Sequence, residues 1–86
     1  MKMNLKVSIV GLGKLGASMA AAIASRGFEV VGVDVNKRAV DLLNAGHAPV
    51  QETNLEETIT ANRERLRATT SHRDAILNSD ITLIQR

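Results

Sequence analysis

Hydrophobic residues in the first half of the chain gather in short runs separated by an amphipathic stretch. Leu5–Val10 and Phe28–Val33 are rich in β-branched residues and border on glycine, which is typical of strands buried on both faces of a parallel sheet. Between them, the good helix formers of Lys14–Arg26 predict a helix that ends at Gly27. Its large apolar residues recur every fourth position and share one face: Leu15, Met19 and Ile23.

Two further helices are predicted after the second apolar run. Asn36 is the expected N-cap of a short amphipathic helix that contains Ala39, Val40 and Leu43 and closes at Gly46. The segment Thr53-Asn54-Leu55-Glu56 has the pattern of a capping box, in which Thr53 caps a helix with Leu55 and Ile59 on its inner face.

The last twenty residues add two short strands and a brief helix. Leu66–Thr69 and Ile81–Ile84 have the composition of strands. Between them, Ser71-His72-Arg73-Asp74 is a second capping-box candidate, followed by Ala75, Ile76 and Leu77.

This alternation of strands and helices predicts the α/β class, with a parallel sheet and right-handed crossovers. We expect a partial Rossmann, or doubly wound, fold of four strands in the order 3-2-1-4. The 86 residues allow one small domain over residues 1–86 and leave no room for a second. Ile81–Ile84 would then be an unpaired apolar edge, so self-association through this fourth strand is expected.

A glycine motif stands between the first predicted strand and the first predicted helix. Gly11-Leu12-Gly13-Lys14-Leu15-Gly16 is a G-x-G-x-x-G, and each glycine has a separate role in dinucleotide binding. Gly11 permits a tight turn, Gly13 leaves room for a pyrophosphate, and Gly16 lets the helix pack closely. Backbone N–H groups near Lys14 and Leu15 would face the phosphates at the positive end of the helix dipole.

An acidic residue completes this pattern. Asp34 ends the second predicted strand, 18 residues after Gly16, which is close to the spacing of an acid that hydrogen-bonds the adenosine ribose. A carboxylate there would repel a 2′-phosphate, so NAD is the expected cofactor rather than NADP. Lys37 and Arg38 follow closely and are the basic residues within reach of a phosphate.

Composition excludes several other classes of function. The net charge is only +2, Phe28 is the single aromatic residue, and the basic residues are scattered, so no nucleic-acid partner is expected. The densest basic segment, Asn62–Arg67, is interpreted as the solvated end of a helix. No apolar run approaches the roughly 18 residues that a membrane span needs. The absence of cysteine fits a reducing cytoplasm, and a cytoplasmic location is predicted.

The segment from Val7 to Gly46, with "APVQETNLEE", "RLRATT" and "AILNSDITLI" after it, resembles the N-terminal NAD-binding region of the UDP-glucose/GDP-mannose dehydrogenase family. The resemblance covers almost the whole chain. It implies an enzyme that oxidises the 6-hydroxyl of a nucleotide sugar to a carboxylate in two NAD-dependent steps. By this resemblance Gly11, Gly13 and Gly16 hold the pyrophosphate, Asp34 holds the ribose, and Glu52 matches a loop glutamate of the family.

The chain departs from the family pattern at three places. Lys14 stands where the family usually has an aromatic residue, and Thr53-Asn54 stands where it has Pro-Gly. Ala39 occupies a position that is commonly basic, and Arg38, one residue earlier, is the candidate for that role.

The parts of the family that carry catalysis lie beyond the segment that this chain resembles. The chain has no cysteine for the second oxidation, and neither His47 nor His72 has an evident partner, so no catalytic residue is predicted. The preferred interpretation is the NAD-binding part of a nucleotide-sugar dehydrogenase, which meets its nucleotide sugar only through the missing C-terminal part. Two alternatives are a stand-alone nucleotide-binding module without catalysis and the N-terminal part of another NAD-dependent hydroxy-acid dehydrogenase.

Overall fold

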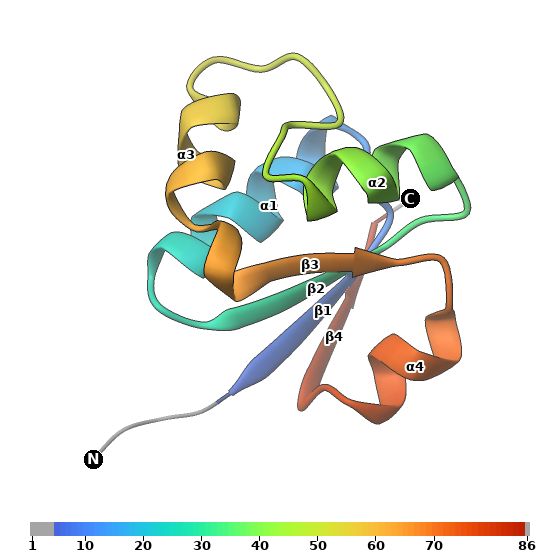
Figure 1. Cartoon of the computed structure of the whole chain (residues 1–86). Helices are drawn as coiled ribbons and strands as arrows, with labels where there is room; N and C mark the ends of the chain where they lie inside the picture. Colours follow the sequence, from blue (N-terminus) through green and yellow to red (C-terminus); the bar gives the residue numbers. More distant parts are fainter. Residues whose placement is uncertain (1–4, 86) are drawn as a thin grey trace.

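The computed structural model describes residues 5–85, which form one parallel sheet with helices on both faces (Figure 1). The strand order is β3-β2-β1-β4, so the predicted fold class and order are confirmed. The strands are β1 (Lys6–Val10), β2 (Glu29–Val33), β3 (Leu66–Thr69) and β4 (Ile81–Ile84). The helices are α1 (Lys14–Ser25), α2 (Lys37–Asn44), α3 (Leu55–Ala61), the 3₁₀ turn η1 (Arg63–Arg65) and α4 (His72–Leu77).

The two faces of the sheet are covered unequally. Helices α1, α2 and α3 lie on one face and the short helix α4 lies on the other (Figure 1). Because side chains alternate along a strand, Val7 and Ile9 point into the larger core beneath α1–α3. A smaller cluster lies under α4 and consists of Val10, Val31, Val33 and Ala75.

The buried face of α1 differs from the one that the large apolar residues predict. Its buried residues are Gly16, Ala17, Ala20, Ala21 and Ala24. Met19 and Ile23 are only partly buried, and Leu15 is 62% exposed. The small side chains let the helix axis approach the sheet closely, so the alanines, rather than the leucine, decide which face of the helix turns inward.

Leu12, the second residue of the glycine motif, is part of the core. Its side chain is 1% exposed and lies over Gly32 in the middle of β2. A Cβ built on Gly32 would lie 2.7 Å from Leu12 Cδ2 and 3.2 Å from Leu43 Cδ2. The missing side chain of Gly32 therefore leaves the space that Leu12 fills, and this contact holds the glycine loop against the sheet.

Two of the three predicted helix caps are present. Asn36 Oδ1 accepts hydrogen bonds from the N–H groups of Arg38 (3.0 Å) and Ala39 (3.3 Å) at the start of α2. Ser71 Oγ accepts the Asp74 N–H at 3.2 Å at the start of α4.

The third cap, the predicted capping box at Thr53, is wrong. Helix α3 begins one residue later than a Thr53 cap requires, and Asn54 stands at its N-cap with φ 64° and no side-chain cap bond. Asn is among the few residues besides Gly that tolerate this left-handed conformation. Asn54 therefore supplies the positive φ at this turn without a glycine.

Side-chain hydrogen bonds to the backbone stabilise the region around β3. Asn44 Nδ2 donates to the Ala68 carbonyl oxygen at 3.0 Å, and Asn44 Oδ1 accepts the Ala68 N–H at 2.7 Å, so the amide pairs with the outer edge of β3 like one residue of a fifth strand. Arg65 Nε donates to the Ala24 carbonyl oxygen at 3.0 Å, at the negative end of α1. The interpretation of residues 62–67 as a solvated helix end is thus wrong in two respects. Arg65 is half-buried and bonded to another element, and Leu66 and Arg67 belong to strand β3, with Leu66 buried.

Candidate functional site: a hollow at the glycine loop

The loop from β1 to α1 places its three glycines in three different surroundings. Gly11 has φ +102°, and a Cβ there would lie 3.0 Å from the Gln85 carbonyl oxygen. A Cβ on Gly16 would overlap the Gly11 carbonyl oxygen, at 1.8 Å, so this position requires glycine for the helix to approach the loop. A Cβ on Gly13 would have no described atom within 4 Å, which leaves open space above the loop.

The amino-terminal end of α1 faces this open space. Its N-cap residue, Gly13, offers no side-chain hydrogen bond, and the first turn has no acidic residue. The caps of α2 and α4, by contrast, satisfy backbone N–H groups with the side chains of Asn36 and Ser71. The first N–H groups and the positive end of the α1 dipole therefore suit an anion placed over Gly13.

Asp34 connects the end of β2 to the glycine loop. Its Oδ2 accepts the Leu12 N–H at 2.8 Å, and its Oδ1 accepts the Asn36 N–H at 2.9 Å. A carboxylate has about four lone-pair directions, so capacity remains for hydroxyl donors of a ligand. The two backbone donors hold the carboxylate in one orientation at the rim of the loop.

These groups surround one hollow of ≈ 210 Å³ at the carboxyl ends of β1, β2 and β4. Its lining contains six of the seven residues that the sequence assigns to cofactor binding, together with Leu12 and Gln85: Gly11, Leu12, Gly13, Lys14, Leu15, Gly16, Asp34 and Gln85. Arg38 does not line it. Gln85 was missed by the sequence reasoning, although its place directly after the fourth predicted strand sets it at the same sheet edge.

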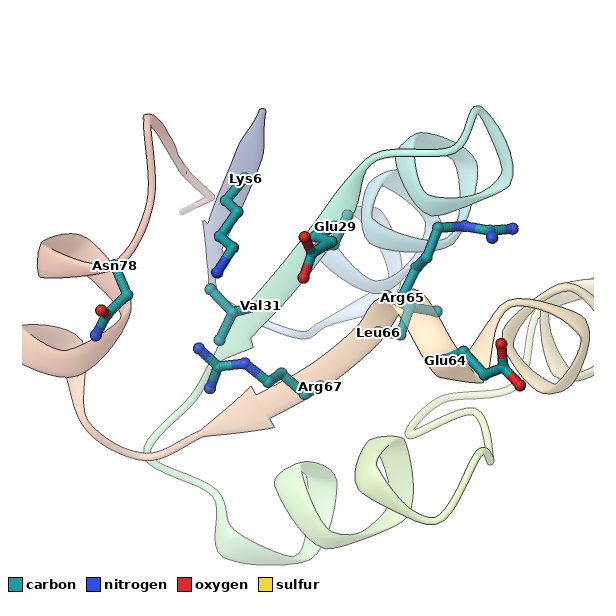
Figure 2. A pocket seen from close by; sticks show the side chains of 9 residues that line it. Lys6, Glu29, Val31, Glu64, Arg65, Leu66, Arg67 and Asn78 are labelled. Atoms are coloured by element: carbon teal, nitrogen blue, oxygen red, sulfur yellow. The ribbon is translucent and has the colours of Figure 1, made fainter. Parts of the chain in front are cut away.

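A second hollow, of ≈ 60 Å³, opens at the opposite ends of the strands (Figure 2). Lys6, Val31 and Arg67 meet there on the face of the sheet that α4 covers, with Asn78 beside them. Basic and acidic side chains are mixed around it, since Glu29, Glu64 and Arg65 also contribute. Because side chains of both charges surround this hollow, it favours neither an anionic nor a cationic ligand.

The two histidines lie away from the glycine loop. His47 has a partner, which the sequence reasoning did not foresee: its Nδ1 lies 2.7 Å from Glu56 Oε2. Glu56 Oε1 also accepts the Ala48 N–H at 2.7 Å. The bond from Ala48, followed by that from His47, lowers the pKa of the Glu56 carboxyl below its ordinary value. The pair thus ties the loop after α2 to α3, while His72 opens α4 at the surface.

Two negative observations apply to the described residues, 5–85. No group of three or more His, Asp or Glu side chains is arranged to hold a metal ion among them. None of their helices has the length and apolar character needed to cross a membrane. Glu52 is exposed and does not line the hollow at the glycine loop.

The hollow at the glycine loop is suited to a dinucleotide. The open space over Gly13 and the uncapped start of α1 can take a diphosphate. The carboxylate of Asp34 can accept hydrogen bonds from the hydroxyls of a neighbouring ribose. It lies outside the carboxyl ends of the strands where the chain order reverses between β1 and β4, which is where α/β sheets bind ligands.

Comparison with curated proteins finds nucleotide-sugar 6-dehydrogenases among the relatives. A GDP-mannose 6-dehydrogenase of Pseudomonas aeruginosa is 42% identical over 82 residues, covering 93% of this chain and 19% of the relative. The UDP-glucose 6-dehydrogenase AglM of Haloferax volcanii is 41% identical over 81 residues, with the same two coverages, 93% and 19%. The chain therefore spans about a fifth of the length of these relatives.

Solved structures agree with the sequences. The crystal structure of a ternary complex of GDP-mannose dehydrogenase from Pseudomonas aeruginosa superposes with a TM-score of 0.89 at 41% identity, over 93% of this chain and 19% of that one. A UDP-glucose dehydrogenase from Pyrobaculum islandicum gives a TM-score of 0.86 at 34% identity, over 95% and 19%. The family profile described as "UDP-glucose/GDP-mannose dehydrogenase family, NAD binding domain" matches residues 5–85. The chain therefore belongs to the UDP-glucose/GDP-mannose dehydrogenase family, and residues 5–85 match the NAD-binding domain of that family.

Proposed function

We propose that this chain supplies the NAD-binding part of a nucleotide-sugar 6-dehydrogenase, an enzyme that oxidises the C6 hydroxyl of a nucleotide sugar to a carboxylate. The observation that supports this most directly is the hollow that brings the glycine loop, the uncapped start of α1 and Asp34 together. The relatives named GDP-mannose and UDP-glucose 6-dehydrogenases support the choice of substrate class. The nucleotide sugar would be bound by parts of the enzyme outside this chain.

The residues of the hollow divide the work of binding. Gly13 gives the diphosphate room to approach, and the N–H groups of Lys14, Leu15 and Gly16 donate to its oxygens. Gly11 and Gly16 set the close packing of loop and helix on which those N–H groups depend. Asp34 accepts from the adenosine ribose hydroxyls.

NAD, when bound, accepts the hydride that leaves the substrate carbon. The residues of this chain bind the cofactor and orient it, and they take no part in proton transfer. The carboxylate of Asp34 disfavours a 2′-phosphate at the same ribose, which supports NAD over NADP. Arg38 lies outside the hollow, and its backbone N–H is held by Asn36, so we assign it only a peripheral role near the ribose edge. A cytoplasmic location fits a protein with no cysteine that uses NAD.

Calorimetric titration of the 86-residue chain with NAD and with NADP tests the proposal. We expect saturable binding of NAD and weaker binding of NADP. Asp34→Ala removes a charge-assisted acceptor and should weaken NAD binding at least about tenfold. Asp34→Asn keeps one acceptor oxygen and removes the charge, so the preference for NAD over NADP should narrow.

Thermal melting of each variant is the necessary control, because Asp34 also accepts the Leu12 N–H and so supports the loop. A chain that melts cooperatively and binds neither cofactor would contradict the proposal. Equal losses for NAD and NADP in Asp34→Asn would show that the carboxylate does not read the ribose.

We also propose that the isolated chain associates with a second copy through β4. In the described part of the chain no strand pairs with the outer edge of β4. Ile81 and Ile84 are exposed there. Two such edges related by a two-fold axis would satisfy each other's backbone groups and bury these side chains.

A further inference from the structure

Gln85 lies against the floor of the glycine-loop hollow. It directly follows β4, and its backbone N–H donates to the Val10 carbonyl oxygen at 2.8 Å, which fixes its position beside the end of β1. Its Cγ lies 3.6 Å from where a Cβ on Gly16 would stand, and its Cβ lies 3.3 Å from where one on Gly11 would stand. The side chain is therefore held at the loop by its own backbone.

The amide of Gln85 has hydrogen-bonding capacity to spare. Within residues 5–85 its recorded side-chain bond runs from Nε2 to Met19 Sδ at 3.4 Å. A thioether sulfur is a weak acceptor, whereas an amide offers two N–H donors and a carbonyl oxygen with two lone pairs. Exchanging the Met19 contact for a better partner would cost little, so the amide is ready to bind a ligand group.

Gln85 and Asp34 stand on opposite sides of the loop. They follow β4 and β2, which pair with β1 from either side. Since neighbouring strands lie about 4.8 Å apart, the two strand ends are separated by roughly 10 Å. A dinucleotide with its first ribose at Asp34 and its diphosphate over Gly13 extends its second half toward β4.

From this placement we propose that the Gln85 amide hydrogen-bonds the hydroxyls of the second ribose, the one beyond the diphosphate as seen from Asp34. An amide that can both donate and accept matches hydroxyl groups, which do the same, better than it matches phosphate oxygens, which only accept. Gln85 is then a cofactor-positioning residue that fixes where the second half of the cofactor starts. This inference rests on the function proposed above.

A series of shortened ligands tests it. The 86-residue chain and its Gln85→Met variant are titrated with ADP, ADP-ribose and NAD, because only the last two carry the second ribose. Methionine keeps the length of the side chain and removes the amide. We expect the affinity for ADP-ribose and NAD to fall about three- to tenfold, the effect of one or two hydrogen bonds, while the affinity for ADP stays unchanged.

Met19→Leu is the matched control, since it removes the sulfur partner and leaves the amide in place. Its affinities for the three ligands should stay within about twofold of the parent chain. An equal loss for ADP in Gln85→Met would overturn the inference, because the amide would then act on the diphosphate or on the loop. Unchanged affinity for ADP-ribose would also overturn it.

A measurement on the unsubstituted chain guards against a variant that fails to fold. The side-chain amide resonances of Gln85 should shift in nitrogen–proton NMR spectra when ADP-ribose is added and stay in place with ADP. Shifts with both ligands, or with neither, would contradict the inference. If the folded chain binds none of the three ligands, the proposed function itself fails, which is a different outcome from binding that is indifferent to Gln85.

Discussion

The two edges of the sheet are built differently. At the β3 edge, Asn44 pairs with both backbone groups of Ala68, and the core beneath α1–α3 lies alongside. At the β4 edge, Ile84 is 67% exposed and Ile81 is 45% exposed. A sheet edge with free backbone groups is a template for another strand. Within residues 5–85, the β3 edge is thus closed by a side chain of the chain itself, whereas the outer edge of β4 keeps its backbone groups unpaired.

The largest expected effect is a cavity on the β3 side. Leu43, on α2, is fully buried, so Leu43→Ala should lower the free energy of unfolding by about 2–5 kcal/mol. Leu77→Ala, on the exposed side of α4, should change it by no more than about 0.5 kcal/mol. Urea unfolding followed by circular dichroism measures both. Equal losses of unfolding free energy in the two variants would show that the two positions are equally packed, and would contradict the difference described above.

The next effect concerns the amide that closes the β3 edge. Asn44→Ala leaves the Ala68 N–H and carbonyl oxygen without their partners and should cost about 1–2 kcal/mol in urea unfolding. It should also promote self-association, because a second edge becomes free. Asn78→Ala is the control, since that amide donates to the Asp74 carbonyl oxygen four residues earlier in the chain and joins no two strands. An equal loss of unfolding free energy in Asn78→Ala and Asn44→Ala would show that closing the β3 edge adds no stability of its own.

A charge on the β4 edge should remove association with little effect on stability. Ile84→Lys places a solvated ammonium group where two edges would meet, so sedimentation velocity should give a monomer over a wide concentration range. The free energy of unfolding of the monomer should change by less than about 0.5 kcal/mol. Val35→Lys alters an exposed valine away from this edge and should leave association as it is. Association that survives Ile84→Lys would point to another surface.

The smallest effect is a pH dependence at the bond between α3 and the loop after α2. The pKa of Glu56 is lowered in the folded chain, so its contribution to stability is complete above the ordinary value of 4.5 and is lost as the pH falls through the lowered pKa. The urea midpoint of the parent chain should exceed that of Glu56→Gln at about pH 6 and converge with it near about pH 3.

Glu57→Gln is the matched control for this titration. It removes the same charge one residue away on α3 without touching the Ala48 N–H. A gap between the parent chain and Glu56→Gln that stays constant down to the lowest pH would show that the carboxylate is not the group responsible.

Local signals in the sequence were enough to predict most of the architecture. The apolar runs predicted the four strands, Asn36 and Ser71 predicted two helix caps, and the glycine motif with Asp34 predicted which residues line the hollow. These features depend on neighbours within a few residues or on the known spacing of a strand–helix–strand unit. The sequence therefore predicted where the elements lie and where their carboxyl ends meet.

Features that depend on distance between elements were not predictable in this way. The buried face of α1 is set by how closely the helix approaches the sheet, which favours Ala17, Ala20 and Ala24 over Leu15. The Asn44–Ala68 pairing joins residues 24 positions apart. Asn54 adopts a left-handed conformation in place of a capping box because the turn before α3 demands a positive φ.

The packing of Leu12 against Gly32 has a consequence for redesigning cofactor preference. The positions between the motif glycines belong to two classes, because Leu12 is a core residue while Lys14 and Leu15 lie at the surface of the hollow. A mutational library that varies all three would lose most of its members to misfolding at position 12. Restricting diversity to positions 14 and 15, with Gly32 and Leu12 held as a pair, concentrates the search on side chains that can meet a ligand.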